Sequence, residues 1–200
     1  MNTGLMKTGS LLLNIKSVAV FCGSSTGAKP EYIKSARETG RIIGSADLDL
    51  IFGGGNVGLM GAVSGAAVMN GANVTGVLPE RISGMLSPTE GIRLISVKTM
   101  HERKQKMYDL ADGFLILPGG IGTFEEAFEV CTWNQLGYMS KPLCFINISG
   151  FYSPLRAFLR NTVDEKFLKQ EHYCQIHFED TPEKALRKII GFQPEYVSKL

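Results

Sequence analysis

The chain has 200 residues, the size of one globular domain, and its 44% apolar and 20% charged residues are typical of a soluble folded protein. The net charge is only +2 and the lysines and arginines are scattered, which disfavours a nucleic-acid partner, because such proteins carry a basic stripe. No run of 18 apolar residues occurs, so we expect no membrane partner.

The first residues and the cysteines indicate where the protein works. The only apolar run before residue 17 is three leucines, too short for a secretory signal. We therefore expect a flexible N-terminal extension over 1–16 and a single domain over 17–200. No cysteine belongs to a Cys-x-x-Cys pair, so free thiols in a reducing, cytoplasmic compartment are expected. The cysteines are Cys22, Cys131, Cys144 and Cys174.

Short apolar runs alternate with longer helical segments along the chain. Most of the runs are continuously apolar, as strands buried on both faces are. The expected strands are Val18–Cys22, Leu48–Phe52, Val74–Leu78, Ile92–Val97, Phe114–Leu117 and Leu143–Ile148. The expected helices are Glu31–Ser45, Leu59–Asn70, Thr99–Ala111, Thr123–Gln135 and one that Thr181 caps, with Pro182 at its first position. This alternation predicts a Rossmann-like, doubly wound, mostly parallel α/β sheet, with ligands beyond the carboxyl ends of the strands.

A glycine-rich loop at 53–61 follows the second expected strand and opens the next helix. It reads Gly-Gly-Gly-Asn-Val-Gly-Leu-Met-Gly. Glycines here let the backbone turn sharply and approach a phosphate, and free amides at the helix start attract the anion. The G-x-G-x-x-G spacing is present but follows the wrong strand for a dinucleotide fingerprint. Alternatively, the glycines only permit close packing of helix against sheet.

A second glycine-rich loop, at 118–126, also joins a strand to a helix and reads Pro-Gly-Gly-Ile-Gly-Thr-Phe-Glu-Glu. Thr123 and Glu126 have capping-box spacing, with Thr123 at the N-cap, so both could serve only to satisfy backbone donors. A capping box, however, does not require the glycines before it. Two glycine-rich helix starts at one sheet edge would supply enough converging donors to hold a phosphate and part of a sugar.

The helix expected before the fifth strand carries an arginine on its inward-facing apolar stripe. Helical spacing places Arg103 in line with Met107 and Leu110, with Lys104 bordering the stripe. A buried arginine keeps its proton and needs an anionic partner, which a phosphate or a carboxylate such as Glu126 would provide. Alternatively, Arg103 extends past the core to water.

Two other groups of polar residues give weaker indications. Small hydroxyl residues in the loop 21–27, after the first expected strand, could either bind ligand oxygens or cap the next helix. His172 and His177 have no acidic or cysteine partners at ligand spacing, so no metal site is expected.

Four motifs occur in order: Gly-Gly-Gly-x-x-Gly-Leu-Met-Gly at 53–61, Met-His-Glu-Arg-Lys at 100–104, Pro-Gly-Gly-x-Gly-Thr-x-x-Glu at 118–126 and Thr-Trp-x-Gln-Leu-Gly at 132–137. Together they resemble the LOG family of cytokinin riboside 5′-monophosphate phosphoribohydrolases, often labelled lysine decarboxylases. The resemblance covers nearly the whole chain. No lysine lies in a setting that suggests a pyridoxal phosphate Schiff base, so decarboxylation is unsupported.

The resemblance implies a Rossmann-like homodimer that releases base and ribose 5-phosphate from a nucleoside 5′-monophosphate, a cytokinin precursor or AMP, without a cofactor. It implies Arg103 and Glu126 as the catalytic pair. The acid that plant members use after the third strand is one residue displaced here, at Glu80, and Met139 replaces a common histidine. Both departures bear on substrate preference. The expected substrate-binding positions are Gly54, Gly55, Lys104, Gly119, Gly120, Ile121, Gly122, Thr123, Phe124, Glu125 and Thr132.

Breaking an N-glycosidic bond places positive charge on the sugar. We expect Glu126 to stabilise that charge, activate water or attack directly, and Glu125 to contact the ribose hydroxyls. Arg103 would orient the phosphate or Glu126, or polarise the leaving base. The competing hypotheses are a broader nucleotide N-glycosidase, a non-catalytic carrier of a phosphorylated ligand such as molybdopterin, and an NAD-dependent oxidoreductase, for which no second domain remains.

Overall fold

The computed structural model of the chain describes residues 15–83, 90–192 and 194–197, and these form one seven-stranded sheet. The strand order is β4-β3-β2-β1-β5-β6-β7, and each neighbouring pair is parallel. The strands are β1 (Ser17–Phe21), β2 (Asp49–Phe52), β3 (Val74–Pro79), β4 (Ile92–Val97), β5 (Gly113–Ile116), β6 (Leu143–Ile146) and β7 (Ile176–Glu179). The predicted doubly wound α/β fold is therefore confirmed.

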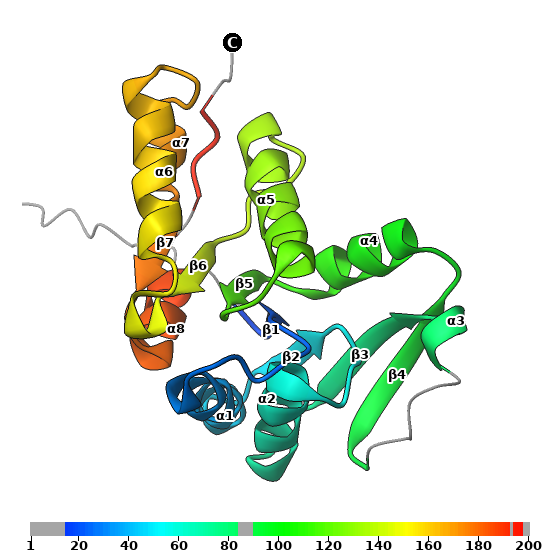
Figure 1. Cartoon of the computed structure of the whole chain (residues 1–200). Helices are drawn as coiled ribbons and strands as arrows, with labels where there is room; N and C mark the ends of the chain where they lie inside the picture. The colour runs from blue at the N-terminus through cyan, green and yellow to red at the C-terminus, as the bar shows by residue number, and fades with distance from the viewer. Residues whose placement is uncertain (1–14, 84–89, 193, 198–200) are drawn as a thin grey trace, which may run out of the picture.

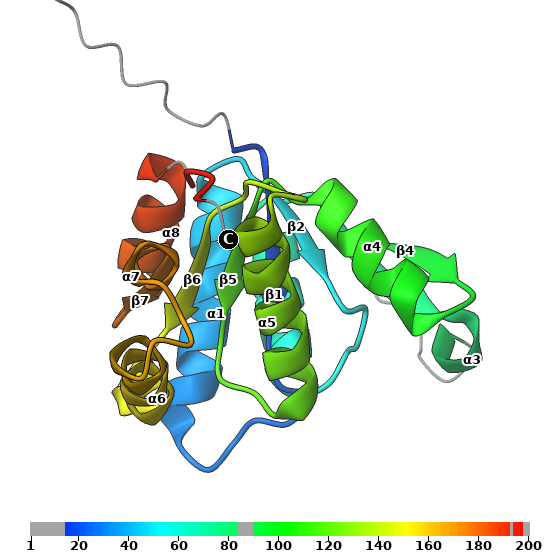
Figure 2. The same cartoon turned by 90° about the horizontal axis from the view of Figure 1, so that it is seen from above.

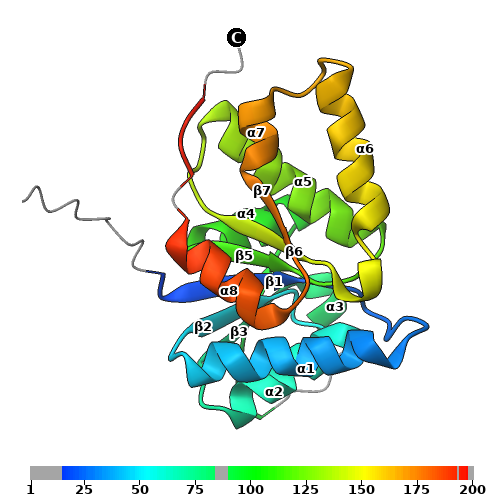
Figure 3. The same ribbon diagram turned by 90° about the vertical axis from the view of Figure 1, so that its left-hand side faces the viewer.

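Helices cover both faces of this sheet (Figure 1). α1, α2 and α8 lie against one face, and α4 and α5 lie against the other, with α6 and α7 beside α5 (Figure 3). The helices are α1 (Pro30–Ser45), α2 (Gly58–Met69), α3 (Glu80–Ser83), α4 (Met100–Leu110), α5 (Ile121–Leu136), α6 (Ser153–Asp164), α7 (Gln170–Cys174) and α8 (Pro182–Gly191), with a short 3-10 turn at Ile148–Gly150.

The central strands bury both of their faces, as their continuous apolar sequences predict. In β1, Val18 and Val20 pack into the core on the α1 side, whereas Ala19 and Phe21 pack into the core on the α5 side. Successive side chains of a strand point to opposite faces, so a strand between two helical layers must be apolar at every position. This packing makes the middle of the sheet a rigid platform for the loops at its edge.

The six expected strands occur, one of them with the expected bounds and the others with ends shifted by at most two residues, and the five expected helices occur as well. The last helix begins as predicted, because the Thr181 hydroxyl accepts a hydrogen bond from the Lys184 amide at 3.4 Å. The elements not expected from the sequence are β7, α3, α6, α7 and the 3-10 turn at Ile148–Gly150. β7 is an edge strand of four residues, Ile-His-Phe-Glu, which is too short and too mixed to be recognised from composition.

The expected N-terminal extension, 1–16, falls almost entirely outside the described residues, which begin at Ile15. Ile15 is buried in the core on the α1 side, and the Lys16 amide donates to an Asp112 carboxylate oxygen at 2.9 Å. The chain therefore joins the domain two residues before the expected boundary. Within the part of the chain that the structure describes, no helix is both long and apolar enough to cross a membrane.

Candidate active site

The site lies where the strand order changes direction, between β1 and β5. The chain leaves β1 toward α1 on one face and leaves β5 toward α5 on the other, so the two loops diverge from adjacent strands (Figure 2). The Gly23 amide donates to the Pro118 carbonyl at 3.0 Å and ties the loops together at their base. Such a divergence produces a crevice at the carboxyl edge of a parallel sheet, which is where α/β proteins bind ligands.

A cavity of about 380 Å³ occupies this crevice. The loop after β1, the loop after β2, α4 and the start of α5 all contribute to its wall, although they are far apart in sequence. Its lining residues are Val20, Phe21, Cys22, Gly23, Ser24, Gly53, Met60, Met100, Arg103, Gly120, Ile121, Gly122, Thr123, Glu125 and Glu126.

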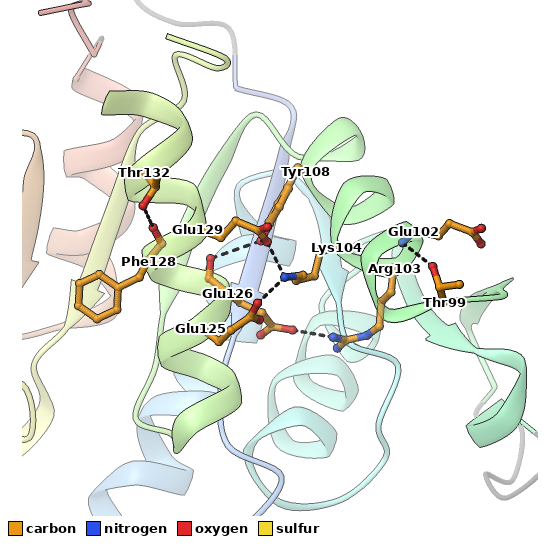
Figure 4. A network of polar contacts seen from close by, with 10 residues as sticks. All are labelled: Thr99, Glu102, Arg103, Lys104, Tyr108, Glu125, Glu126, Phe128, Glu129 and Thr132. Atoms are coloured by element: carbon orange, nitrogen blue, oxygen red, sulfur yellow. Dashed lines mark hydrogen bonds and ion pairs between the residues drawn. The ribbon is translucent and has the colours of Figure 1, made fainter. Parts of the chain in front are cut away.

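An ion pair forms part of the cavity wall. Nη1 of Arg103, on α4, lies 2.6 Å from Oε1 of Glu126, on α5, and each side chain is only 12% exposed (Figure 4). Nε of Arg103 also donates to the carbonyl of Val77, in β3, at 3.0 Å. The guanidinium is therefore fixed by two elements, and it holds the carboxylate in one orientation.

Gly53 makes room for this guanidinium. A β-carbon at position 53 would lie 2.2 Å from Nη2 of Arg103. The first glycine of the 53–61 loop therefore permits the close approach of a side chain, and it also lines the cavity. Gly54 and Gly55 do not line the cavity: a β-carbon at Gly54 would meet Leu78, and one at Gly55 would meet Met60.

Burial has the largest effect on the pKa of the Glu126 carboxyl. Burial raises the pKa of the Glu126 carboxyl above its ordinary value of 4.5, and the attraction and hydrogen bond of Arg103 oppose that rise only in part. Glu125 and Lys104 act more weakly, the first raising this pKa and the second lowering it. Glu126 is thus a carboxylate with higher basicity than a surface glutamate, a property suited to stabilising cations or accepting protons.

The predicted capping role of Thr123 and Glu126 is wrong. α5 begins at Ile121, with Gly120 as its N-cap in an extended conformation, so Thr123 is the third residue of the helix. The Pro-Gly-Gly turn lets the helix start two residues earlier than expected, and the Thr123 side chain is buried beneath Gly119. A true threonine cap occurs on α4, where the Thr99 hydroxyl accepts from the Glu102 amide at 3.1 Å.

The start of α5 presents backbone amides to the cavity. No side chain among the described residues caps this helix, and the first intrahelical bond, from the Phe124 amide to the Gly120 carbonyl, is 3.1 Å long. β-Carbons at Gly120 and Gly122 would meet nothing within 4 Å, so these positions open onto the cavity. Free amides and the helix dipole make this end an anion-binding surface.

Glu125 also lines the cavity, but Lys104 does not. Lys104 turns into the seam between α4 and α5, where its ammonium contacts the carboxylates of Glu125 and Glu129 (Figure 4). Burial acts to lower the pKa of Lys104, but its hydrogen bonds to Glu125 and Glu129 outweigh burial and raise it. Lys104 therefore stays an ammonium and is unsuited to forming a Schiff base.

Three other expected positions lie away from the cavity. Gly119 packs against Thr123 and the Gly23 amide. The Phe124 ring packs edge-to-face against the Tyr152 ring, with centroids 6.2 Å apart. Thr132 sits further along α5, where its hydroxyl donates to the Phe128 carbonyl at 2.8 Å and lines a separate cavity toward α7. The structure brings the other expected positions together around the cavity: Arg103, Gly120, Ile121, Gly122, Thr123, Glu125 and Glu126.

The sequence reasoning missed part of the wall, including Cys22, Met60 and Met100. Burial and, second, the Glu126 carboxylate raise the pKa of the Cys22 thiol, so it is neutral and is not an activated nucleophile. The signal that could have identified Cys22 was its position at the carboxyl end of the first expected strand. Among residues 15–83, 90–192 and 194–197, no three His, Cys, Asp or Glu side chains are grouped to hold a metal ion.

Comparisons with known proteins agree on one family. A family model described as possible lysine decarboxylase matches residues 60–189. The cytokinin riboside 5′-monophosphate phosphoribohydrolase LOG7 of Arabidopsis thaliana is 40% identical over 182 residues, which are 90% of this chain and 84% of that protein. A probable enzyme of the same name, LOGL2 of Oryza sativa subsp. japonica, is 39% identical over 92% of this chain and 78% of its own length.

Solved structures share the fold at lower identity. The molybdenum cofactor binding protein of Rippkaea orientalis superposes with a TM-score of 0.65 at 22% identity, covering 88% of this chain and 95% of that one. The molybdenum cofactor carrier protein of Chlamydomonas reinhardtii gives 0.64 at 16% identity, covering 86% and 93%. At these identities the likeness establishes the architecture alone.

Proposed function

Because the chain belongs to the LOG family, we propose that it is a hydrolase that cleaves the N-glycosidic bond of a nucleoside 5′-monophosphate and releases free base and ribose 5-phosphate. The observation that carries this proposal is the cavity in which the Arg103–Glu126 pair faces the amide-rich start of α5. The relatives named above support the same reaction, since their names give this activity and the chain spans most of their length.

The 5′-phosphate is proposed to bind at the start of α5. The amides of residues 121–123 and the side chain of Thr123 supply donors, and the bare glycines at 120 and 122 let a phosphate approach the backbone. Anchoring this remote group fixes the position of the reacting carbon, so binding energy is used to orient the sugar.

Glu126 is proposed to act on the anomeric carbon. The bond between C1′ and the base nitrogen breaks, the pair of electrons leaves with the base, and the sugar acquires oxocarbenium character that a neighbouring carboxylate stabilises. Water then supplies hydroxide to C1′ and a proton to the base, so no cofactor is required. Arg103 positions Glu126, and Glu125, which also lines the cavity, is proposed to accept hydrogen bonds from the ribose hydroxyls.

The proposal also specifies which nucleotide is the substrate. We propose adenine nucleotides, either AMP or a cytokinin riboside monophosphate such as the isopentenyl form. Incubating the purified protein with AMP, CMP, GMP and isopentenyladenosine monophosphate, and separating the released bases by chromatography, distinguishes the two. Release of none of the bases would refute the hydrolase proposal.

A carrier of a phosphorylated ligand is the competing hypothesis from another class. A carrier would gain nothing from a buried carboxylate beside an anion, because that charge opposes binding. Glu126 therefore favours catalysis. Copurification of an intact phosphorylated ligand, together with absence of base release from all four nucleotides, would support the carrier instead.

Activity should depend on pH through Glu126. If the ionised carboxylate is required, kcat should fall as the pH decreases through the pKa of Glu126, and burial places this limb above pH 4.5. The measurement is kcat at saturating substrate from pH 4 to 8. Residual activity of Glu126→Gln should lack this limb, whereas a limb that persists in the variant belongs to the substrate phosphate, whose second pKa is about 6.

Gly53→Ala should lower activity by displacing Arg103. The new methyl group would lie 2.2 Å from Nη2, so the guanidinium must leave its place beside Glu126. We expect a loss of about 10²-fold in kcat/KM, comparable to misplacing a catalytic group by about 1 Å. The matched control is Gly65→Ala on α2, where a β-carbon meets nothing within 4 Å. This variant should keep full activity and gain up to about 1 kcal/mol of stability from helix propensity.

We also propose that the protein is a cytoplasmic homodimer. A groove of about 490 Å³ between α4 and α5 offers a surface where Val97, Tyr108 and Trp133 lie among polar and charged side chains of the two helices. Light scattering coupled to size-exclusion chromatography should give about twice the chain mass of 21.8 kDa. A mass of one chain at micromolar concentration would contradict the dimer.

A further inference from the structure

A third carboxylate of α5, that of Glu129, lies behind the cavity, one helical turn after Glu125. Glu129 does not line the cavity, but its Oε2 lies 2.8 Å from the ammonium of Lys104. The same ammonium contacts Glu125, which does line the cavity (Figure 4). From the other side, the Tyr108 hydroxyl donates to Glu129 at 2.6 Å. We refer to Lys104, Tyr108, Glu125 and Glu129 as the α4–α5 seam.

Helical spacing makes this arrangement rigid. Glu125 and Glu129 are four residues apart on α5, and Lys104 and Tyr108 are four apart on α4, so each pair projects from one face of its helix. Two carboxylates at this spacing would repel each other alone. An ammonium between them removes the repulsion and, with its side chain only 9% exposed, gains two acceptors for its protons.

The seam is anchored in the core at the end opposite the cavity. Tyr108 is 2% exposed, and its ring packs against the rings of Phe21, Phe114 and Trp133 with centroids 5.4–6.4 Å apart. Because three rings contact the Tyr108 ring, the direction of its hydroxyl is constrained. The hydrogen bond from this hydroxyl in turn constrains the carboxylate of Glu129. Exposure therefore increases along the seam from Tyr108, through the side chains of Lys104 at 9% and Glu129 at 25%, to that of Glu125 at 53%.

Glu125 is the member of the seam whose side-chain conformation the other three restrict. Its side chain is 53% exposed, and an exposed glutamate ordinarily samples several rotamers. We propose that Glu129 is a positioning residue for the reaction: it secures Lys104 at the seam, and Lys104 in turn holds the Glu125 carboxylate toward the sugar hydroxyls of the substrate. This inference rests on the proposed function, and it assigns Lys104 to orienting Glu125 in place of direct substrate contact.

The role predicts a particular kinetic signature. Contacts to ribose hydroxyls that are equal in ground state and transition state change KM and leave kcat nearly unaltered. In Glu129→Gln the amide oxygen still accepts from Tyr108, but the charge that secures Lys104 is lost. We expect KM to rise about tenfold with kcat within twofold of wild type, a coupling of ordinary size for neighbours in one network. The inhibition constant of ribose 5-phosphate should rise by the same factor.

The test is a double-mutant cycle with Glu125→Gln. If Glu129 acts through Glu125, then Glu129→Gln should raise KM in the wild-type background and have no further effect in the Glu125→Gln background. Tyr108→Phe, which removes only the hydroxyl, should give a smaller rise of the same kind, and it replaces Glu129→Gln in the cycle should that variant fail to fold. Glu31→Gln, an exposed first-turn residue of α1, is the matched control and should change nothing.

The outcomes separate this inference from the function on which it rests. A wild-type protein that releases no base from any nucleotide refutes the proposed hydrolase. With an active wild type, an unchanged KM in a folded Glu129→Gln variant overturns the positioning role, and so does an equal rise in both backgrounds. A lower melting temperature with unchanged KM and inhibition constant would mean that the seam only joins α4 to α5.

Discussion

Glu126→Gln should lose about 10²–10³-fold in kcat, equivalent to about 3–4 kcal/mol of transition-state stabilisation. The amide has the size of the carboxylic acid and can still accept the hydrogen bond of Arg103, but it carries no charge to set against a cationic sugar. Some stability should also be lost, because the buried Arg103 guanidinium loses its charged partner, although the amide oxygen can still accept its hydrogen bond. The measurement is single-turnover release of the free base, which is adenine from saturating AMP and isopentenyladenine from its isopentenyl derivative.

The control for this variant is Glu31→Gln, which removes one carboxylate charge from the exposed start of α1 and should retain wild-type turnover. Circular dichroism and melting temperature establish that both variants are folded. Turnover within a few-fold of wild type in a folded Glu126→Gln protein would remove Glu126 from the mechanism, whatever the status of the substrate-binding residues.

Arg103→Met should be more damaging to stability than Glu126→Gln. It leaves the Glu126 carboxylate in a site where each partner is 12% exposed, and breaking a buried pair from one side typically costs about 3–5 kcal/mol. The glutamate would respond by holding its proton to higher pH, since Arg103 is the main group opposing the effect of burial on its pKa. Activity near neutral pH should therefore fall at least as far as in Glu126→Gln.

The double variant Arg103→Met with Glu126→Gln separates the two effects. Because the uncompensated charge is gone, urea unfolding should recover a large part of the lost stability, while turnover should remain absent. A double variant as unstable as Arg103→Met alone would show that the arginine is needed for packing, for example through its hydrogen bond to the Val77 carbonyl, and that the charge balance matters little.

Much of the fold could be predicted from the sequence because it depends on local signals. Continuous apolar runs identify strands covered on both faces, and the Thr-Pro-Glu start of α8 identifies a cap. The importance of the loops at 53–61 and 118–126 also followed from local pattern, since each glycine-rich loop joins a strand to a helix. β7 was missed for the opposite reason: it is held by pairing with β6, which composition does not reveal.

What the sequence determined by itself was the family, the parallel sheet, and the residue types available at its carboxyl edge. Only the tertiary structure decided which of these residues face one another. In the structure, Lys104 points away from the cavity and contacts Glu129 in the α4–α5 seam. Thr123 lies inside the helix that it was expected to cap, and the absence of a side chain at Gly53 leaves space for the Arg103 guanidinium. Local patterns cannot encode such choices, because ion pairs and close approaches arise between elements that are distant in sequence and meet only when the sheet is assembled.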